Sequence, residues 1–119
     1  MTRLFAACLL LILSCAGASA ASCVISEFQL SAPGGVQVAK MPPIATPMNV
    51  VTSGASQQSG AFSGDTKMIR AWCDTQSAIE IGTNPTASAT VSTPLSAGLA
   101  EYFNVEPVSG LKAAFILRP

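Results

Sequence analysis

The residues of this chain that could do chemistry are few, and none has a histidine partner because the sequence contains no histidine. This excludes Ser-His-Asp and Cys-His nucleophile systems and the usual general base near neutral pH. Ser109 and Lys112 match the S-x-x-K spacing of Ser/Lys acyl enzymes. That chemistry needs a helix, whereas this spacing spans a Pro/Gly turn and the start of a strand. We therefore expect a turn serine and a solvated lysine.

The carboxylates are the second set of candidates. Glu80, Glu101 and Glu106 could pair as general acid and base, but isolated carboxylates of strands and turns usually face water. Asp74-Thr75 matches only the start of an aspartic-protease motif and lacks its glycine, so we expect a turn-capping aspartate. There is no calcium-type spacing and no phosphate-binding glycine loop. The sequence predicts a non-enzymatic protein without metal or cofactor.

The cysteines suggest one covalent link. Cys8 and Cys15 lie in an N-terminal leader, whereas Cys23 and Cys73 lie beyond it. In an exported domain the second pair could form a disulfide, which would contribute about 3–4 kcal/mol by restricting the unfolded chain. The alternative is two unpaired buried cysteines that act as small hydrophobes. Two thiols without a histidine do not make a usual zinc site.

The leader, residues 1–20, has the pattern of a secretory signal peptide. Arg3 is its only charge, an apolar run follows over residues 4–13, and Ala18-Ser19-Ala20 forms an A-x-A exit. The run is shorter than the about 20 apolar residues that span a bilayer. We expect cleavage after Ala20 and an exported protein, periplasmic or extracellular.

Two alternatives to this cleavage stay open. One is an uncleaved membrane anchor, which the small and polar residues of the leader disfavour. The other is lipoprotein processing at Cys15, for which the bulky Leu13 is a poor fit.

Residues 21–119 are enough for one small domain. Five basic and six acidic residues follow the leader. This near-neutral balance argues against nucleic acid, which needs a clustered basic face, and gives no reason to invoke an anionic membrane. No small-molecule substrate is evident. We expect a protein partner or a homo-oligomer.

The elements that must position these residues are short strands, because several runs alternate or are β-branched and none has a sustained helical period. About seven or eight antiparallel strands predict a β-sandwich or jelly roll. The expected strands cover residues 23–30, 36–39, 48–52, 57–62 (weak), 66–73, 77–82, 102–105 and 111–116. Turns are expected at 31–35, at 74–76 and at 106–110, the last two pairing the strands that they join.

The phase of each strand predicts its buried side. In the 66–73 strand one set is purely apolar and is assigned to the core. The predicted core residues are Ile69, Ala71 and Cys73 of that strand, with Ile79, Ile81, Phe103 and Val105 of the others. Glu80 should face water.

The opposite face of the 66–73 strand is the candidate interaction surface. Met68, Arg70 and Trp72 share it, and such an amphipathic set is enriched at interfaces. Tyr102, beside the core residue Phe103, is free for a rim or an interface. The alternative is that Trp72 caps one end of the sandwich while Arg70 is solvated.

From residue 66 onward the order of motifs resembles a group of small proteins encoded by tailed bacteriophages and prophages. The resemblance implies a single β-sandwich, a virion component or accessory protein, without enzymatic activity. The matching motifs are Thr66-x-x-Ile69-Arg70-x-x-x-Asp74, Ile79-x-Ile81-Gly82-Thr83-Asn84-Pro85-Thr86-Ala87, Leu95-x-Ala97-Gly98, Glu101-Tyr102-Phe103-x-Val105 and Gly110-x-Lys112-x-Ala114-x-Ile116.

The leader is a departure from that group, whose members are expected to begin near Ser22-Cys23-Val24-Ile25 without an export signal. Virions assemble in the cytoplasm, so a virion-associated location is the alternative to export. Either the copy is exported or translation starts downstream of Met1. No methionine lies between Met1 and Met41, which weakens the second explanation.

Overall fold

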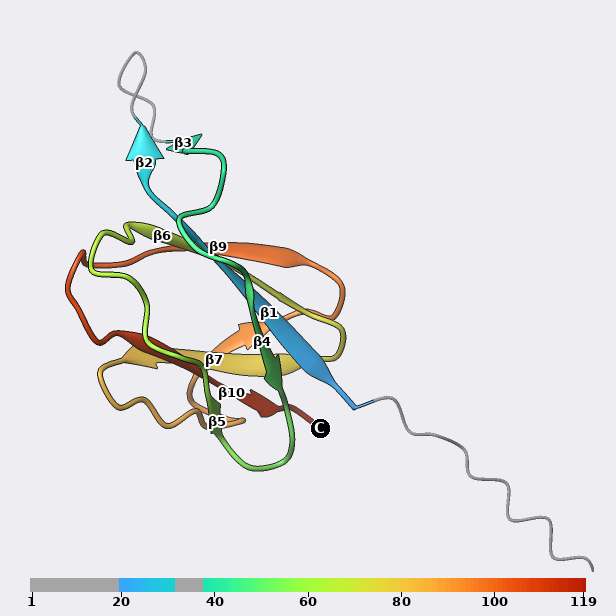
Figure 1. Cartoon of the computed structure of the whole chain (residues 1–119). Helices are drawn as coiled ribbons and strands as arrows, with labels where there is room; N and C mark the ends of the chain where they lie inside the picture. Colours follow the sequence, from blue (N-terminus) through green and yellow to red (C-terminus); the bar gives the residue numbers. More distant parts are fainter. Residues whose placement is uncertain (1–19, 32–37) are drawn as a thin grey trace, which may run out of the picture.

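The computed structural model describes residues 20–31 and 38–119 (Figure 1). The expected signal peptide, its lipoprotein alternative at Cys15 and the expected turn after residue 31 lie outside these residues. The described residues form an all-β fold without a helix, in which two antiparallel sheets of four strands face each other. The predicted β-sandwich is therefore confirmed.

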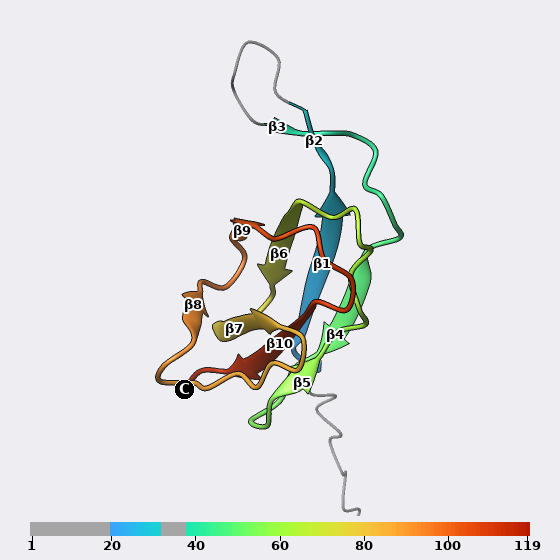
Figure 2. The same cartoon turned by 90° about the vertical axis from the view of Figure 1, so that its left-hand side faces the viewer.

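Each sheet has a simple strand order. The first sheet, in the order β4-β1-β6-β9, consists of β4 (Met48–Val51), β1 (Ser22–Phe28), β6 (Met68–Cys73) and β9 (Ala100–Asn104). The second sheet, in the order β5-β10-β7-β8, consists of β5 (Gln57–Gln58), β10 (Lys112–Leu117), β7 (Ser77–Gly82) and β8 (Thr93–Leu95). A separate pair, β2 (Leu30–Ser31) and β3 (Val38–Ala39), projects from one end of the sandwich (Figures 1 and 2).

The strand positions follow the sequence closely, with differences in several strands. The strand expected over 23–30 ends at Phe28, Leu30 belongs to β2 of the separate pair, and β9 begins at Ala100 rather than at residue 102. The weak strand expected over 57–62 is only the two residues of β5. The sequence pattern does not predict β8, because this strand is short and contains Pro94. A proline removes a ladder donor and is tolerated at a sheet edge, which is where β8 lies.

The predicted strand phase is also confirmed. Ile69, Ala71 and Cys73 are buried, whereas Arg70 between them is exposed. In β7, Ile79 is buried and Glu80 is exposed. Because alternate side chains of a strand point to opposite faces, these patterns fix which side of each strand faces the core.

Three predicted core residues are less enclosed than the others. Ile81, Phe103 and Val105 are half-buried, although they pack against the buried core. The enclosed core lies between β1 and β6 on one side and β7 and β10 on the other. Its buried members are Cys23, Ile25, Val50, Phe62, Ile69, Ala71, Cys73, Ile79, Leu95, Ala113 and Phe115.

The expectation that the turns at 74–76 and 106–110 pair the strands they join is wrong. The first turn connects β6 to β7 and the second connects β9 to β10, and in both cases the two strands belong to different sheets. Inward phase shows which face of a strand is buried, but it does not show which sheet contains the strand. Both turns lead from one sheet to the other along the exposed surface, and the sheets are built from strands distant in sequence.

Glycine is needed in two of the connections. Gly98, before β9, has φ of 75°, and Gly110, before β10, has φ of 84°. Side chains other than glycine rarely adopt such angles. The chain reverses at both glycines, and the second reversal is part of the turn expected at 106–110.

Candidate interaction surface

The four residues predicted to form an interaction surface lie together on the outer face of the first sheet, the side away from the core. Arg70 of β6 lies directly between Ser26 of β1 and Tyr102 of β9. Trp72 and Met68 occupy the same side of β6, on either side of Arg70 along the strand. Tyr102 is 58% exposed, Arg70 is exposed, and Met68 and Trp72 are half-buried.

The outer face of the second sheet is covered by the chain itself. The segment 83–92 crosses it, and Pro85 and Ala87 are buried there. Hydrogen bonds fasten this segment to the sheet and to the loop before β5. The amide of Gln58 donates to Asn84 Oδ1 (3.0 Å) and to the carbonyl of Pro85 (2.8 Å), Ala87 N donates to Ser56 Oγ (2.9 Å), and Ser92 Oγ donates to Glu80 Oε2 (2.8 Å). The first sheet is covered at β1, where the outward-facing Ser26 and Phe28 are buried, but it leaves Arg70 and Tyr102 exposed.

A disulfide links β1 to β6 in the first sheet, and a carboxylate next to it adds hydrogen bonds between the same strands. Cys23 and Cys73 are bonded and fully buried, with 4.1 Å between their Cα atoms. Beyond them, Asp74 Oδ1 accepts a hydrogen bond from Ser22 N (2.9 Å), and Asp74 N donates to the carbonyl of Ser22 (3.1 Å). The Ser22 hydrogen bond lowers the pKa of Asp74 below its usual 3.8. Asp74 thus holds the turn, as expected.

A second carboxylate, at the far end of β1, is a functional group that the sequence analysis missed. Glu27 is buried, and its Oε1 accepts hydrogen bonds from Ser63 N and Thr66 Oγ1, both at 2.6 Å. The alternation along the strand could have revealed it, because Glu27 lies on the same side of β1 as Cys23 and Ile25, which face the core. Glu27 ties the loop before β6 to the first sheet.

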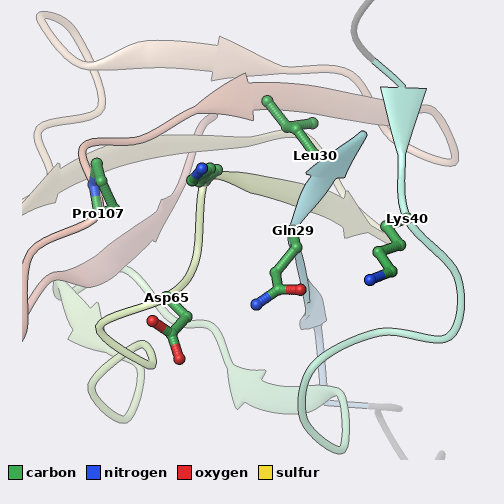
Figure 3. A pocket seen from close by; sticks show the side chains of 6 residues that line it. Gln29, Leu30, Lys40, Asp65 and Pro107 are labelled. Carbon is green, nitrogen blue, oxygen red and sulfur yellow. The ribbon is translucent and has the colours of Figure 1, made fainter. Parts of the chain in front are cut away.

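A charged hollow of about 340 Å³ lies at this end of the sandwich (Figure 3). Gln29 lies between Lys40 and Asp65, and Lys67 and Pro107 complete the wall with Leu30. Backbone hydrogen bonds fix the walls, with Lys40 N donating to the carbonyl of Gln29 (2.8 Å) and Lys67 N to that of Phe28 (3.0 Å). The charged side chains themselves are exposed, so the hollow resembles an ordinary solvated surface.

The candidate catalytic residues do not form a site. Ser109 and Lys112 flank the left-handed Gly110 in a turn that leads into β10, without the helix that S-x-x-K chemistry needs. Glu80 accepts a hydrogen bond from Ser92 on the outer side of β7, whereas Glu101 lies in β9 of the other sheet. Over residues 20–31 and 38–119, no cluster of three or more metal-ligating side chains occurs. Within the same residues, none of the secondary structure is a helix of the length and apolarity that crosses a membrane.

Comparisons with known proteins identify no relative of this chain. No protein-family model matches the chain, and neither the curated proteins nor the solved structures contain a match to it.

Proposed function

We propose that this chain is a non-enzymatic structural or interaction protein, similar to the small virion-associated proteins of tailed phages, and that it docks on a larger assembly or on itself. The observation that carries this proposal is the difference between the two outer faces. The chain covers its own second sheet with the segment 83–92, but leaves Arg70 and Tyr102 of the first sheet exposed side by side. Tyrosine, tryptophan and arginine are the residues that most often dominate the energy of protein interfaces.

A photo-crosslinker tests this docking surface in the native host. A benzoylphenylalanine in place of Tyr102 should give a crosslinked protein, because this side chain is 58% exposed on the outer face, next to Arg70. The matched control is the same substitution at Val91, which is 85% exposed but belongs to the segment over the second sheet. Equal crosslinking from both positions, or none from Tyr102, would contradict the docking proposal.

An exported binding module of the bacterial periplasm or cell surface is the second candidate. The specific observation in its favour is the buried Cys23–Cys73 disulfide, which is consistent with an oxidising, exported location. Intact-mass measurement on protein from the native host separates the candidates. Export with cleavage after Ala20 gives a chain that starts at Ala21, whereas a full-length cytosolic chain starting at Met1 removes the export proposal.

A further inference from the structure

The side of the sandwich formed by β9 has an open strand edge. Within the described part of the chain, β9 pairs only with β6. Val105 N donates to the carbonyl of Lys67 (3.0 Å), and backbone groups alternate in direction along a strand, so those of Phe103 also point toward β6. The backbone groups of Tyr102 and Asn104 consequently point away from the sheet. They offer an unpaired donor and acceptor row to another strand.

An apolar groove of about 420 Å³ lies beside this edge. Ile81, Val105 and Leu111 line it and are among the partly buried residues that pack against the core. Val108, which also lines it, is 48% exposed. β8 pairs with β7 only as far as Ile79, so it does not extend along the end of β7. Figure 2 shows β9 next to β6 in the first sheet. The groove presents side chains that pack against the core next to this unpaired backbone edge.

The charged residue in the lining of the groove is acidic, whereas Lys67, which lies opposite Val105 just before β6, lines the other hollow. Glu106 lines the groove, and Glu101 lies in β9 on the same side of the strand as Phe103. No lysine or arginine is among the described residues that line the groove. A ligand with a positive charge next to its apolar side chains would complement this surface.

We infer that an extended segment of a partner protein adds to the first sheet at β9. Its backbone pairs with Tyr102 and Asn104, its apolar side chains at alternate positions enter the groove, and a lysine or arginine faces Glu101 or Glu106. Strand addition of this kind takes affinity from the backbone and specificity from alternate side chains. The inference rests on the proposal that the chain acts by binding protein, but it concerns a surface different from the outer face.

A second copy of the chain fits this edge less well than a partner segment. Two β9 strands in symmetric pairing would each bring an inward-facing Glu101 and a Glu106 to the joint. Like charges close together are destabilising, and inward-pointing charges on an edge strand oppose self-pairing.

A library of random short peptides, selected on the purified full chain, tests the inference directly on the strand edge. Selected peptides should carry apolar residues at alternate positions with a neighbouring lysine or arginine. Their binding should slow hydrogen exchange at the amides of Tyr102 and Asn104 by about tenfold or more. Val108→Asp should weaken binding by about tenfold or more, whereas Val91→Asp should not.

Peptide analogues provide a test that does not depend on the folding of a variant. Methylation of the peptide amides that face β9 should abolish binding, and methylation of the alternate amides should not. A selection without enriched binders, binders that ignore Val108→Asp, or exchange protection at Tyr102 that rises with protein concentration alone would overturn the inference. The last result would assign the edge to a second copy. Crosslinking from Tyr102 to a partner in the native host is still expected after such a failure, because the Tyr102 side chain lies on the outer face and only its backbone belongs to the strand edge.

Discussion

Cys23 and Cys73 occupy directly opposed positions on the neighbouring strands β1 and β6, and they form a pair without backbone hydrogen bonds between them. The next pair along the ladder, Ser22 and Asp74, makes the backbone hydrogen bond instead. Side chains approach closest at positions of the first kind, which lets two cysteines bond within one sheet. The disulfide therefore fixes the register of the two central strands of the first sheet.

The disulfide should protect both cysteines from alkylation in the unfolded domain until a reductant is added. The variant Cys23→Ala/Cys73→Ala should be less stable by about 3–4 kcal/mol, because a loop of this length is no longer closed in the unfolded chain. Urea unfolding measures the difference. Complete labelling of the untreated protein would show free thiols instead.

The Asp74 carboxylate should make stability depend on pH. Its pKa in the folded protein is lowered, chiefly by the Ser22 N–H, so its contribution is present above the ordinary value of 3.8 and is lost as the pH falls through the lower folded value. Asp74→Asn should therefore be less stable than the parent at pH 6, and the two should converge in acid. Thermal unfolding over a pH series would show this. A gap that persists unchanged in acid would mean that the carboxylate charge has no part in it.

Truncation of Ile79 and of Ile81 should cost different amounts of stability, because the two side chains differ in burial although both lie on the inner side of β7. Ile79 is 2% exposed, and truncation to alanine should cost about 2–5 kcal/mol. Ile81→Ala should cost less, because this side chain borders the groove and is only half-buried. Val91→Ala, on the surface, should stay within about 0.5 kcal/mol. Equal losses at Ile79 and Ile81 would contradict an open groove.

The buried Glu27 should contribute more to the free energy of unfolding than its position on a strand suggests. Glu27→Ala removes the acceptor for Ser63 N and Thr66 Oγ1, and each hydrogen bond to a charged group contributes about 1.5–3 kcal/mol. Glu27→Gln keeps an oxygen acceptor and should lose less than half as much as Glu27→Ala. Chemical denaturation of the two variants measures the ratio. Indistinguishable losses would indicate that packing, not hydrogen bonding, holds the loop before β6.

The sequence was sufficient to predict the fold class and the inward side of the strands, because alternation in β6 and β7 is a local property. It was also sufficient to place Arg70 and Trp72 on the outward side of one strand, since the phase of a strand determines its exposed side. That Tyr102 lies beside Arg70 depends on the pairing of β9 with β6. Strand partners were not predictable, because they depend on which sheet contains each strand. The groove beside β9 has the same origin: it exists because β8 ends its pairing at Ile79, and no local pattern encodes that.

The sequence separation between the paired strands β1 and β6 has a consequence for the order in which the domain assembles. β1 is the first strand of the sandwich to be synthesised, and its central neighbour β6 brings Cys73 50 residues after Cys23. Until then the apolar side of β1 is not covered, and its backbone lacks the hydrogen bonds that it makes with β6. Contacts between distant parts of a chain make folding slow, because the intervening loop must close before they form. β4 can pair with one edge of β1 earlier, but the other edge of β1 stays open to chaperones and to other strands until β6 has been synthesised.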